Sequence, residues 1–256
     1  LQGSLNIRDI SLINMITNNK ISLKNIGTNI DFQSSNDINN LLFSNLDFLT
    51  EYADYKDNVI RATFNGFNLE KVAINRLYMK DIKNTINFIP TLFNKTINSM
   101  LRNIHDGYFE NLVLLDLNNN EKFRYSINFK DIGFINNTKL SMNNITGNLL
   151  GSAKSGKLFI GGKDVKGSIN TIDKFKLSRL KGLIIYKISN DVISLSSEKL
   201  QLGDSHSADI YGTFSNSYSK YKIKIQGSLK GLMKIIPEKY NKFMELKNIS
   251  FDSQYN

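Results

Sequence analysis

The stretch from Leu177 to Leu229 constrains the fold of this chain most strongly, because apolar and polar residues alternate there in four short runs separated by turn-forming residues. The runs are Ile184/Tyr186/Ile188, Ile193/Leu195, Ile210/Gly212/Phe214 and Tyr221/Ile223/Ile225, and the breakers are Ser189–Asp191, Gly203–Ser205 and Ser215–Ser217. Alternation with a period of two between turn signals predicts an antiparallel meander with one apolar and one polar face. The functional question is what covers the apolar face.

The first third of the chain also favours strands, with one exception. Residues 3–32 predict two strands joined by a turn at Asn18–Asn19, and residues 59–79 predict a strand, a turn at Asn65–Gly66, and then a strand or a helix. Between them, four leucines in residues 36–58 have near-helical spacing among many Asn and Asp residues, which favours a loop with one short helix.

The middle of the chain contains the clearest strand. Phe123, Tyr125, Ile127 and Phe129 alternate with polar residues after a predicted turn at residues 118–120. Residues 140–150 and 157–169 continue the β pattern, with glycines at the expected turns.

Two Pro-marked apolar stripes predict amphipathic helices at residues 89–104 and 232–246. Pro90 and Pro237 stand near the starts of these stripes, and Pro90 stands where a first-turn proline is expected. The His105–Gly107 segment is expected to end the first helix.

Composition narrows the possible functions. None of the 256 residues is Cys, which excludes disulfides, thiol catalysis and Cys-ligated metal. The net charge of +10 permits attraction to nucleic acid or anionic lipid, but the Lys residues are scattered and favour a solvated sheet face. No apolar run is long enough to span a membrane, and no signal peptide is visible. We therefore interpret the chain as a piece of a longer protein whose anchor or signal lies outside it.

No combination of residues indicates catalysis. The only histidines are His105 and His206, and the Asp204-Ser205-His206 cluster is better explained as a turn than as a hydrolase triad, because triads join residues far apart in sequence. The Gly151–Lys157 and Gly161–Asp164 segments lack a phosphate-loop pattern followed by a helix, and we expect hairpin turns there. We predict no enzyme activity, no metal and no cofactor.

Two stretches nevertheless resemble a known family. The first runs from Ile89-Pro90 through Met100-Leu101 and Gly107 to Leu114, a helix that leads into a strand at a glycine. The second runs from Leu177 through Gly182, Leu200–Asp204 and Ala208–Thr213 to Ile235–Tyr240. Residues 85–245 thereby resemble the periplasmic region of YhdP-type members of the AsmA-like family of Gram-negative bacteria, a family that also includes TamB. His105-Asp106 stands where that family commonly has a proline.

The resemblance implies a mainly β fold, an elongated, curved antiparallel sheet that forms an open U-shaped groove with a few short amphipathic helices. Residues 1–84 would be its β-rich N-terminal segment, and residues 85–256 a groove segment containing both helices. It implies a periplasmic, bridge-like lipid transfer protein, anchored to the inner membrane by a segment outside this chain. Such a protein would move phospholipid between the inner and outer membranes and support the outer-membrane permeability barrier.

The resemblance implies no binding of nucleic acid, and contact with the membranes is expected through parts outside this chain. On the same basis we expect the acyl chains to be held by residues that line the groove. They are Phe123, Tyr125, Ile127, Phe129, Ile184, Tyr186, Ile193, Leu195, Ile210, Phe214, Ile223 and Ile225. The alternative is that the same residues fill the closed core of a β-sandwich that binds a protein or glycan, as an adhesion domain does, without lipid transfer.

Overall fold

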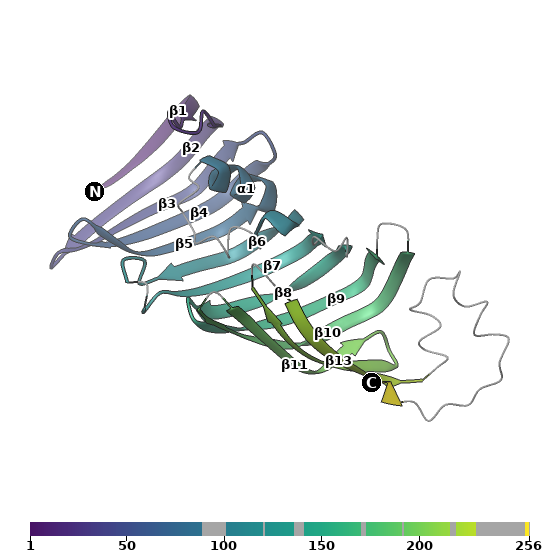
Figure 1. The fold of residues 1–256 in the computed structure, drawn as a ribbon. Coiled ribbons are helices and arrows are strands. Elements are labelled where there is room, and N and C mark those ends of the chain that lie inside the picture. The colour runs from purple at the N-terminus through teal and green to yellow at the C-terminus, as the bar shows by residue number, and fades with distance from the viewer. Residues whose placement is uncertain are drawn as a thin grey trace. The chain divides into compact units, whose positions relative to one another are not determined.

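The chain folds into strands that follow one another in a single antiparallel sheet, in which the strand order is the chain order from β1 to β14. The computed structural model describes residues 1–88, 101–119, 121–135, 141–169, 173–190, 192–215, 219–228 and 254–255. Contacts divide the chain into two compact units, residues 1–129 and 130–256. Figure 1 shows long, bent strands in both units.

In its described residues the first unit contains six complete strands and one complete helix. They are β1 (Gln2–Ile13), β2 (Lys20–Ser35), β3 (Ile38–Leu49), β4 (Asp54–Asn65), β5 (Asn68–Tyr78), α1 (Met79–Phe88) and β6 (Ile104–Leu115). Strand β7 (Arg124–Ile135) crosses the boundary between the units.

The second unit continues with strands alone among its described residues. They are β8 (Ser141–Ser152), β9 (Ser155–Ile169), β10 (Asp173–Ser189), β11 (Val192–Leu202), β12 (His206–Phe214), β13 (Ser219–Gly227) and β14 (Gln254–Tyr255).

The predicted fold class, a mainly β chain built as an open, curved antiparallel sheet with few short helices, is confirmed. The sandwich alternative required two packed sheets, whereas the described strands all belong to one sheet. Residues 101–103 are helical and lead into β6, at the end of the predicted helix 89–104. The rest of that helix, and all of helix 232–246, lie outside the described residues. No helix in the described part of the chain is long and apolar enough to cross a membrane.

The prediction of a loop with a short helix in residues 36–58 is wrong, because β3 and the start of β4 occupy this region. Strand β3 carries Leu41 and Phe43, then Asn45 with φ of +49°, then Leu46 and Phe48. The left-handed residue shifts the alternation by one position, so that apolar residues on both sides of it reach the same face. The step of three residues from Phe43 to Leu46 interrupts the period of two, so the alternation that would indicate a strand is lost from the sequence.

The same device recurs once in each of eight strands. The left-handed residues have φ between +49° and +63° and are Asn25, Asn45, Asp57, Asn111, Asp131, Asn144, Asp164 and Lys199. Seven of the eight are Asn or Asp, the residues after glycine that adopt this conformation most easily. Pairing registers shift beside several of them, as expected of β-bulges, which bend a strand and increase its twist.

Side chains satisfy the backbone groups that the bulges release. Asp47 Oδ1 accepts the N–H of Asp57 at 2.8 Å, and Asp209 Oδ1 accepts the N–H of Lys199 at 2.9 Å. Asn58, which is 2% exposed, donates to the Arg76 carbonyl and accepts the Arg76 N–H, both at 3.0 Å. The side chain therefore replaces a strand residue in the ladder, and the buried polar groups of the bent strand remain paired.

Helix α1 follows β5 without a linker and covers part of the apolar face of the first unit (Figure 1). Its Met79, Ile82 and Ile86 are buried, at spacings of three and four residues that place them on one stripe. The helix is about 15 Å long, close to the three strand spacings between β5 and β2. At its end the amides of Asn14 and Asn19, from the β1–β2 connection, donate to the Phe88 and Asn87 carbonyls. Helix α1 therefore crosses the strands and is held at both ends.

The left-handed residues generate a testable prediction. Asn45→Val should lower the free energy of unfolding by about 1–2 kcal/mol, because a β-branched residue is strained in the left-handed region. Asn45→Gly should be close to neutral. Urea unfolding of both variants measures the difference. The control is Asn29→Val on β2, at an exposed position without a left-handed backbone. An equally small effect of Val at both positions would contradict the assigned role of Asn45.

Candidate functional site

The register of β10–β13 brings eight of the predicted residues onto one face of the second unit. Cross-strand partners share a face, so the pairings define rows across the sheet. The rows are Ile184–Ser197–Ile210–Ile223, Tyr186–Leu195–Gly212–Tyr221 and Ile188–Ile193–Phe214–Ser219, with Ala208–Ile225 beside the first. We call the surface formed by Ile184, Tyr186, Ile188, Ile193, Leu195, Ala208, Ile210, Phe214, Ile223 and Ile225 the apolar face of the second unit.

Most side chains of this apolar face are only half-buried. Tyr186 is buried, whereas Ile223 is 43% exposed, and Ile184, Ile193, Leu195, Ile210, Phe214 and Ile225 lie between these extremes. Among the described residues of the second unit every element is a strand of the sheet, so no described helix lies over these rows. The surface is therefore apolar, continuous over four strands and partly open.

Aromatic rings lie over glycines on the partner strands and close the gaps that the glycines would leave. Tyr186 lies over Gly156, its register partner, and over Gly151 of the same hairpin. Phe175 covers its partner Gly167 in the same way, and His206 covers Gly227. A Cβ at any of these glycines would collide with the ring. These pairs make the apolar face smooth. Because a larger residue would collide with the ring, each of these positions requires glycine.

The other four predicted residues lie at β7. Tyr125, Ile127 and Phe129 alternate along the strand, and Phe123 precedes it with its ring centroid 5.8 Å from that of Tyr125. Phe129 is buried and the other three are half-buried. Burial raises the pKa of the Tyr125 hydroxyl to about 12. These four residues of the β7 region therefore also form an apolar surface.

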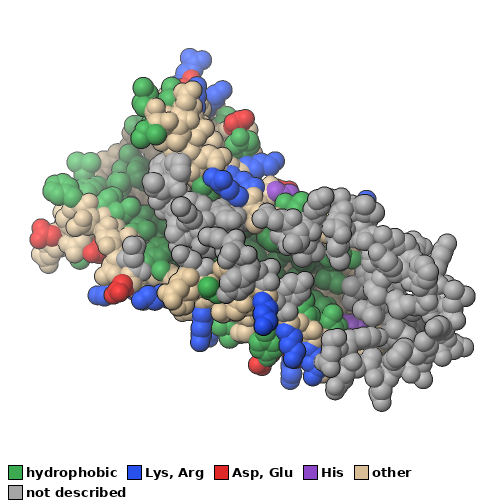
Figure 2. Space-filling view, in the orientation of Figure 1, with side chains coloured by type: hydrophobic (Ala, Val, Ile, Leu, Met, Phe, Trp, Pro, Cys, Tyr) green, Lys and Arg blue, Asp and Glu red, His purple; other side chains and the backbone are tan. Residues whose placement is uncertain are grey.

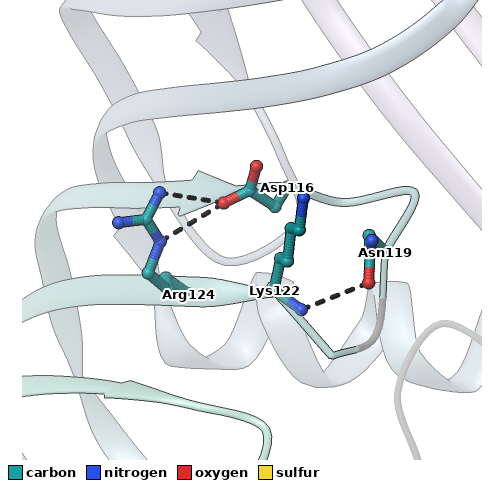
Figure 3. Close-up of polar contacts among 4 residues, drawn as sticks. All are labelled: Asp116, Asn119, Lys122 and Arg124. Atoms are coloured by element: carbon teal, nitrogen blue, oxygen red, sulfur yellow. Dashed lines mark hydrogen bonds and ion pairs between the residues drawn. The ribbon is translucent and has the colours of Figure 1, made fainter.

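The connection between β6 and β7 is held by polar contacts (Figure 3). The Arg124 guanidinium donates to Asp116 Oδ2 at 2.9 and 3.2 Å, and Asn119 accepts the Lys122 N–H. Because the Arg124 side chain is exposed, this pair fixes the turn rather than forming a site.

A cavity of about 270 Å³ lies between α1 and the sheet in the first unit. Apolar and polar side chains both line it, and the lining residues are Lys20, Ile21, Ser22, Leu23, Phe48, Thr50, Glu51, Tyr55, Leu77, Asp81, Asn84 and Thr85. Figure 2 shows hydrophobic side chains gathered over the strands of this unit.

Tyr55 and Asp81 form the polar centre of this cavity. The Tyr55 hydroxyl donates to Asp81 Oδ2 at 2.8 Å and accepts the Tyr78 N–H at 3.0 Å, while the Tyr55 ring stacks on Phe48 with centroids 4.2 Å apart. Burial raises the pKa of Asp81, and hydrogen bonds from Tyr55 and Thr50 offset this in part. Burial also raises the pKa of Tyr55. We did not predict this centre, because residues 36–58 were interpreted as a loop and Asp81 stands 26 residues from its partner.

The clusters considered for catalysis do not assemble. Asp204 Oδ2 accepts a hydrogen bond from Ser178 at 2.9 Å and not from His206, whose Nδ1 lies 3.1 Å from its neighbour Ser205 Oγ. His105 is exposed on β6. The described residues contain no group of His, Asp or Glu that could hold a metal ion.

The two glycine-containing segments also have structural explanations. Gly151–Lys157 includes the predicted turn, between β8 and β9. Gly161–Asp164 is not a turn, contrary to the prediction, but lies inside β9 at the left-handed Asp164.

These features describe an open β-sheet protein with a partly covered apolar face. Comparison with protein-family models, with curated proteins and with solved structures finds no match.

The Tyr55 hydroxyl provides a prediction about stability. Tyr55→Phe should lower the free energy of unfolding by about 1–3 kcal/mol, because the half-buried Tyr78 N–H loses its acceptor. Chemical denaturation measures this loss, with Tyr211→Phe at an exposed position as the control. Equal stabilities of the two variants would show that the hydrogen bond is replaceable.

Asp81 provides a prediction about pH. Its folded pKa lies above the unfolded value of 3.8, so the folded state disfavours the ionised form and loses stability as the pH rises above that value. Asp81→Asn removes this penalty and keeps an acceptor for Tyr55. The variant should exceed the wild type in free energy of unfolding near pH 7, and the difference should shrink toward about pH 3. A difference independent of pH would contradict the assigned cause.

Proposed function

We propose that this chain is a segment of a periplasmic, bridge-like lipid transfer protein, which holds the acyl chains of phospholipid on its apolar face. In this proposal the protein moves phospholipid between the inner and outer membranes, and a segment outside this chain anchors it to the inner membrane. The observation that carries the proposal is the set of half-buried apolar rows on β10–β13. The resemblance of residues 85–245 to AsmA-like proteins supports the same conclusion.

The energetics favour an apolar ligand of this kind. An acyl chain of about 16 carbons gains on the order of 12 kcal/mol on leaving water, at about 0.8 kcal/mol per CH₂. The exposed parts of Ile210, Ile223 and Ile225 gain from the same transfer. Because the rows repeat across strands with similar side chains, an acyl chain can move along them with little change in free energy. Such a surface needs neither a catalyst nor a metal.

Mass spectrometry of the purified 256-residue chain tests the proposal, and we expect co-eluting phospholipid. Ile223→Asp should reduce the bound lipid several-fold, because it places a charge among the apolar rows at a position that is 43% exposed and therefore tolerates it structurally. Tyr211→Asp is the matched control: Tyr211 is 46% exposed and lies on the opposite face of the neighbouring strand β12, opposite Lys222.

The two substitutions lie on opposite faces of the sheet and have similar exposed fractions. A difference in bound lipid between the variants therefore shows which face of the sheet binds the lipid. A folded wild-type chain without lipid would contradict the proposal and leave a binding or adhesion role for the same surface. An equal loss in both variants would also contradict it.

A further inference from the structure

The net charge of the chain is confined to one of its two units. Residues 1–129 contain 13 Lys and Arg against 13 Asp and Glu, whereas residues 130–256 contain 20 against 10. The whole excess of +10 therefore belongs to the second unit. A bias in codon composition that favours Lys would act on both units, so it does not account for this asymmetry.

The register gathers eight of these cations on one face. They lie at positions of β9 and β10 whose register faces away from the apolar face, and all are exposed. They are Lys157, Lys163, Lys166, Lys174, Lys176, Arg179, Lys181 and Lys187. We call this surface the basic face; it is the side of β9–β10 opposite the apolar face. Its acidic neighbours include Asp164, which pairs with Lys176 at 2.7 Å, Asp204, which is bonded to Ser178, and the exposed Glu198 on the adjacent strand β11.

The pairing within the basic face is unfavourable for folding. Lys163 is the direct partner of Arg179, and Lys166 is the direct partner of Lys176. Like charges in direct opposition destabilise a sheet. The first unit uses the opposite arrangement, in which Asp9 faces Lys24 and Arg76 faces Glu110. Asp164, which pairs with Lys176 and is attracted to Lys166 and Lys163, offsets the repulsion within the basic face only in part, because one carboxylate faces several cations. The remaining excess of positive charge would be neutralised by an anionic partner.

Exposed apolar residues lie among these cations. Phe159 is 44% exposed, Ile185 38% and Leu150 41%. Ile185 and Leu150 are both direct partners of Lys157, and Phe159 follows two residues later on the same face. Cations mixed with exposed aliphatic and aromatic residues match an interfacial membrane surface, where the cations meet anionic headgroups and the apolar side chains enter the acyl boundary.

We propose that the basic face of β9–β10 docks on an anionic phospholipid bilayer. Seven of its eight cations are Lys, which are point charges suited to a diffuse anionic surface rather than to bidentate recognition of defined phosphates. This docking does not depend on the apolar face, because it concerns adsorption of the protein on a bilayer and not lipid carried by the protein.

Co-sedimentation of the 256-residue chain with vesicles tests the docking. The chain should bind vesicles of phosphatidylcholine with about one-third phosphatidylglycerol, should bind pure phosphatidylcholine vesicles weakly, and should lose binding as salt approaches about 0.5 M. The triple variant Lys163→Gln/Lys166→Gln/Lys181→Gln, which leaves the Lys176–Asp164 pair intact, should bind about tenfold or more weakly.

The control is Lys24→Gln/Arg61→Gln/Lys71→Gln, which also removes three positive charges, but from exposed positions of the first unit. It should bind nearly as the wild type does. The basic-face variant should also melt no lower than the wild type, because it relieves two like-charge pairs.

Three results would overturn the proposal. They are equal weakening by the two triple variants, equal binding to neutral and anionic vesicles, and binding to single-stranded nucleic acid in place of vesicles. Lipid co-eluting with the basic-face variant at the wild-type level would separate this docking from the lipid-carrying role proposed above.

Discussion

The structure depends on one constraint, that a long bent strand must keep its apolar residues on one face. A bend in a strand disturbs the alternation of side chains, and an uncorrected shift by one residue would move half of the apolar set into water. Single left-handed residues such as Asn45 and Asp164 mark the bulges where the alternation shifts, and the inward-facing residues on either side of them are three positions apart in place of two. At other bulges side chains complete the backbone pairing: Asp47 accepts the N–H of Asp57, Asp209 accepts the N–H of Lys199, and Asn58 pairs with the backbone of Arg76 on the neighbouring strand. The frequent Asn and Asp residues within these strands therefore have a structural role.

The two units differ in the chemical properties of both sides of their sheets. In the first unit the apolar face is partly covered by α1, whose contact with the sheet contains the Tyr55–Asp81 centre. In the second unit the rows beginning at Ile184 and Tyr186 have only strands around them in the described residues. The opposite side differs as well, since cations face acids in the first unit and face other cations on β9–β10. Surface charge thus differs between two units built from the same kind of strand.

Much of this could be predicted from sequence where the alternation is uninterrupted. The runs around Ile184, Ile193, Ile210 and Ile223 predicted both the strands and the set of residues that share a face, because period-two patterning reports orientation directly. The prediction failed where a bulge breaks the period, as in residues 36–58, and where a segment rich in glycine lies inside a strand, as at Gly161–Asp164. The opposition of Lys163 and Arg179 could not be predicted, because pairing register is a property of two strands and is not encoded in either alone.

The agreement between strand order and chain order has a consequence for how such a chain is made and how it evolves. Each strand bonds only to the strands before and after it in sequence, so each new hairpin can be added to a finished edge as synthesis proceeds. No distant segment has to arrive before the next strand can pair, which keeps the entropy of loop closure low despite the β content. For the same reason, hairpins can be duplicated or deleted without rerouting the chain, so the length of the sheet is a freely adjustable trait.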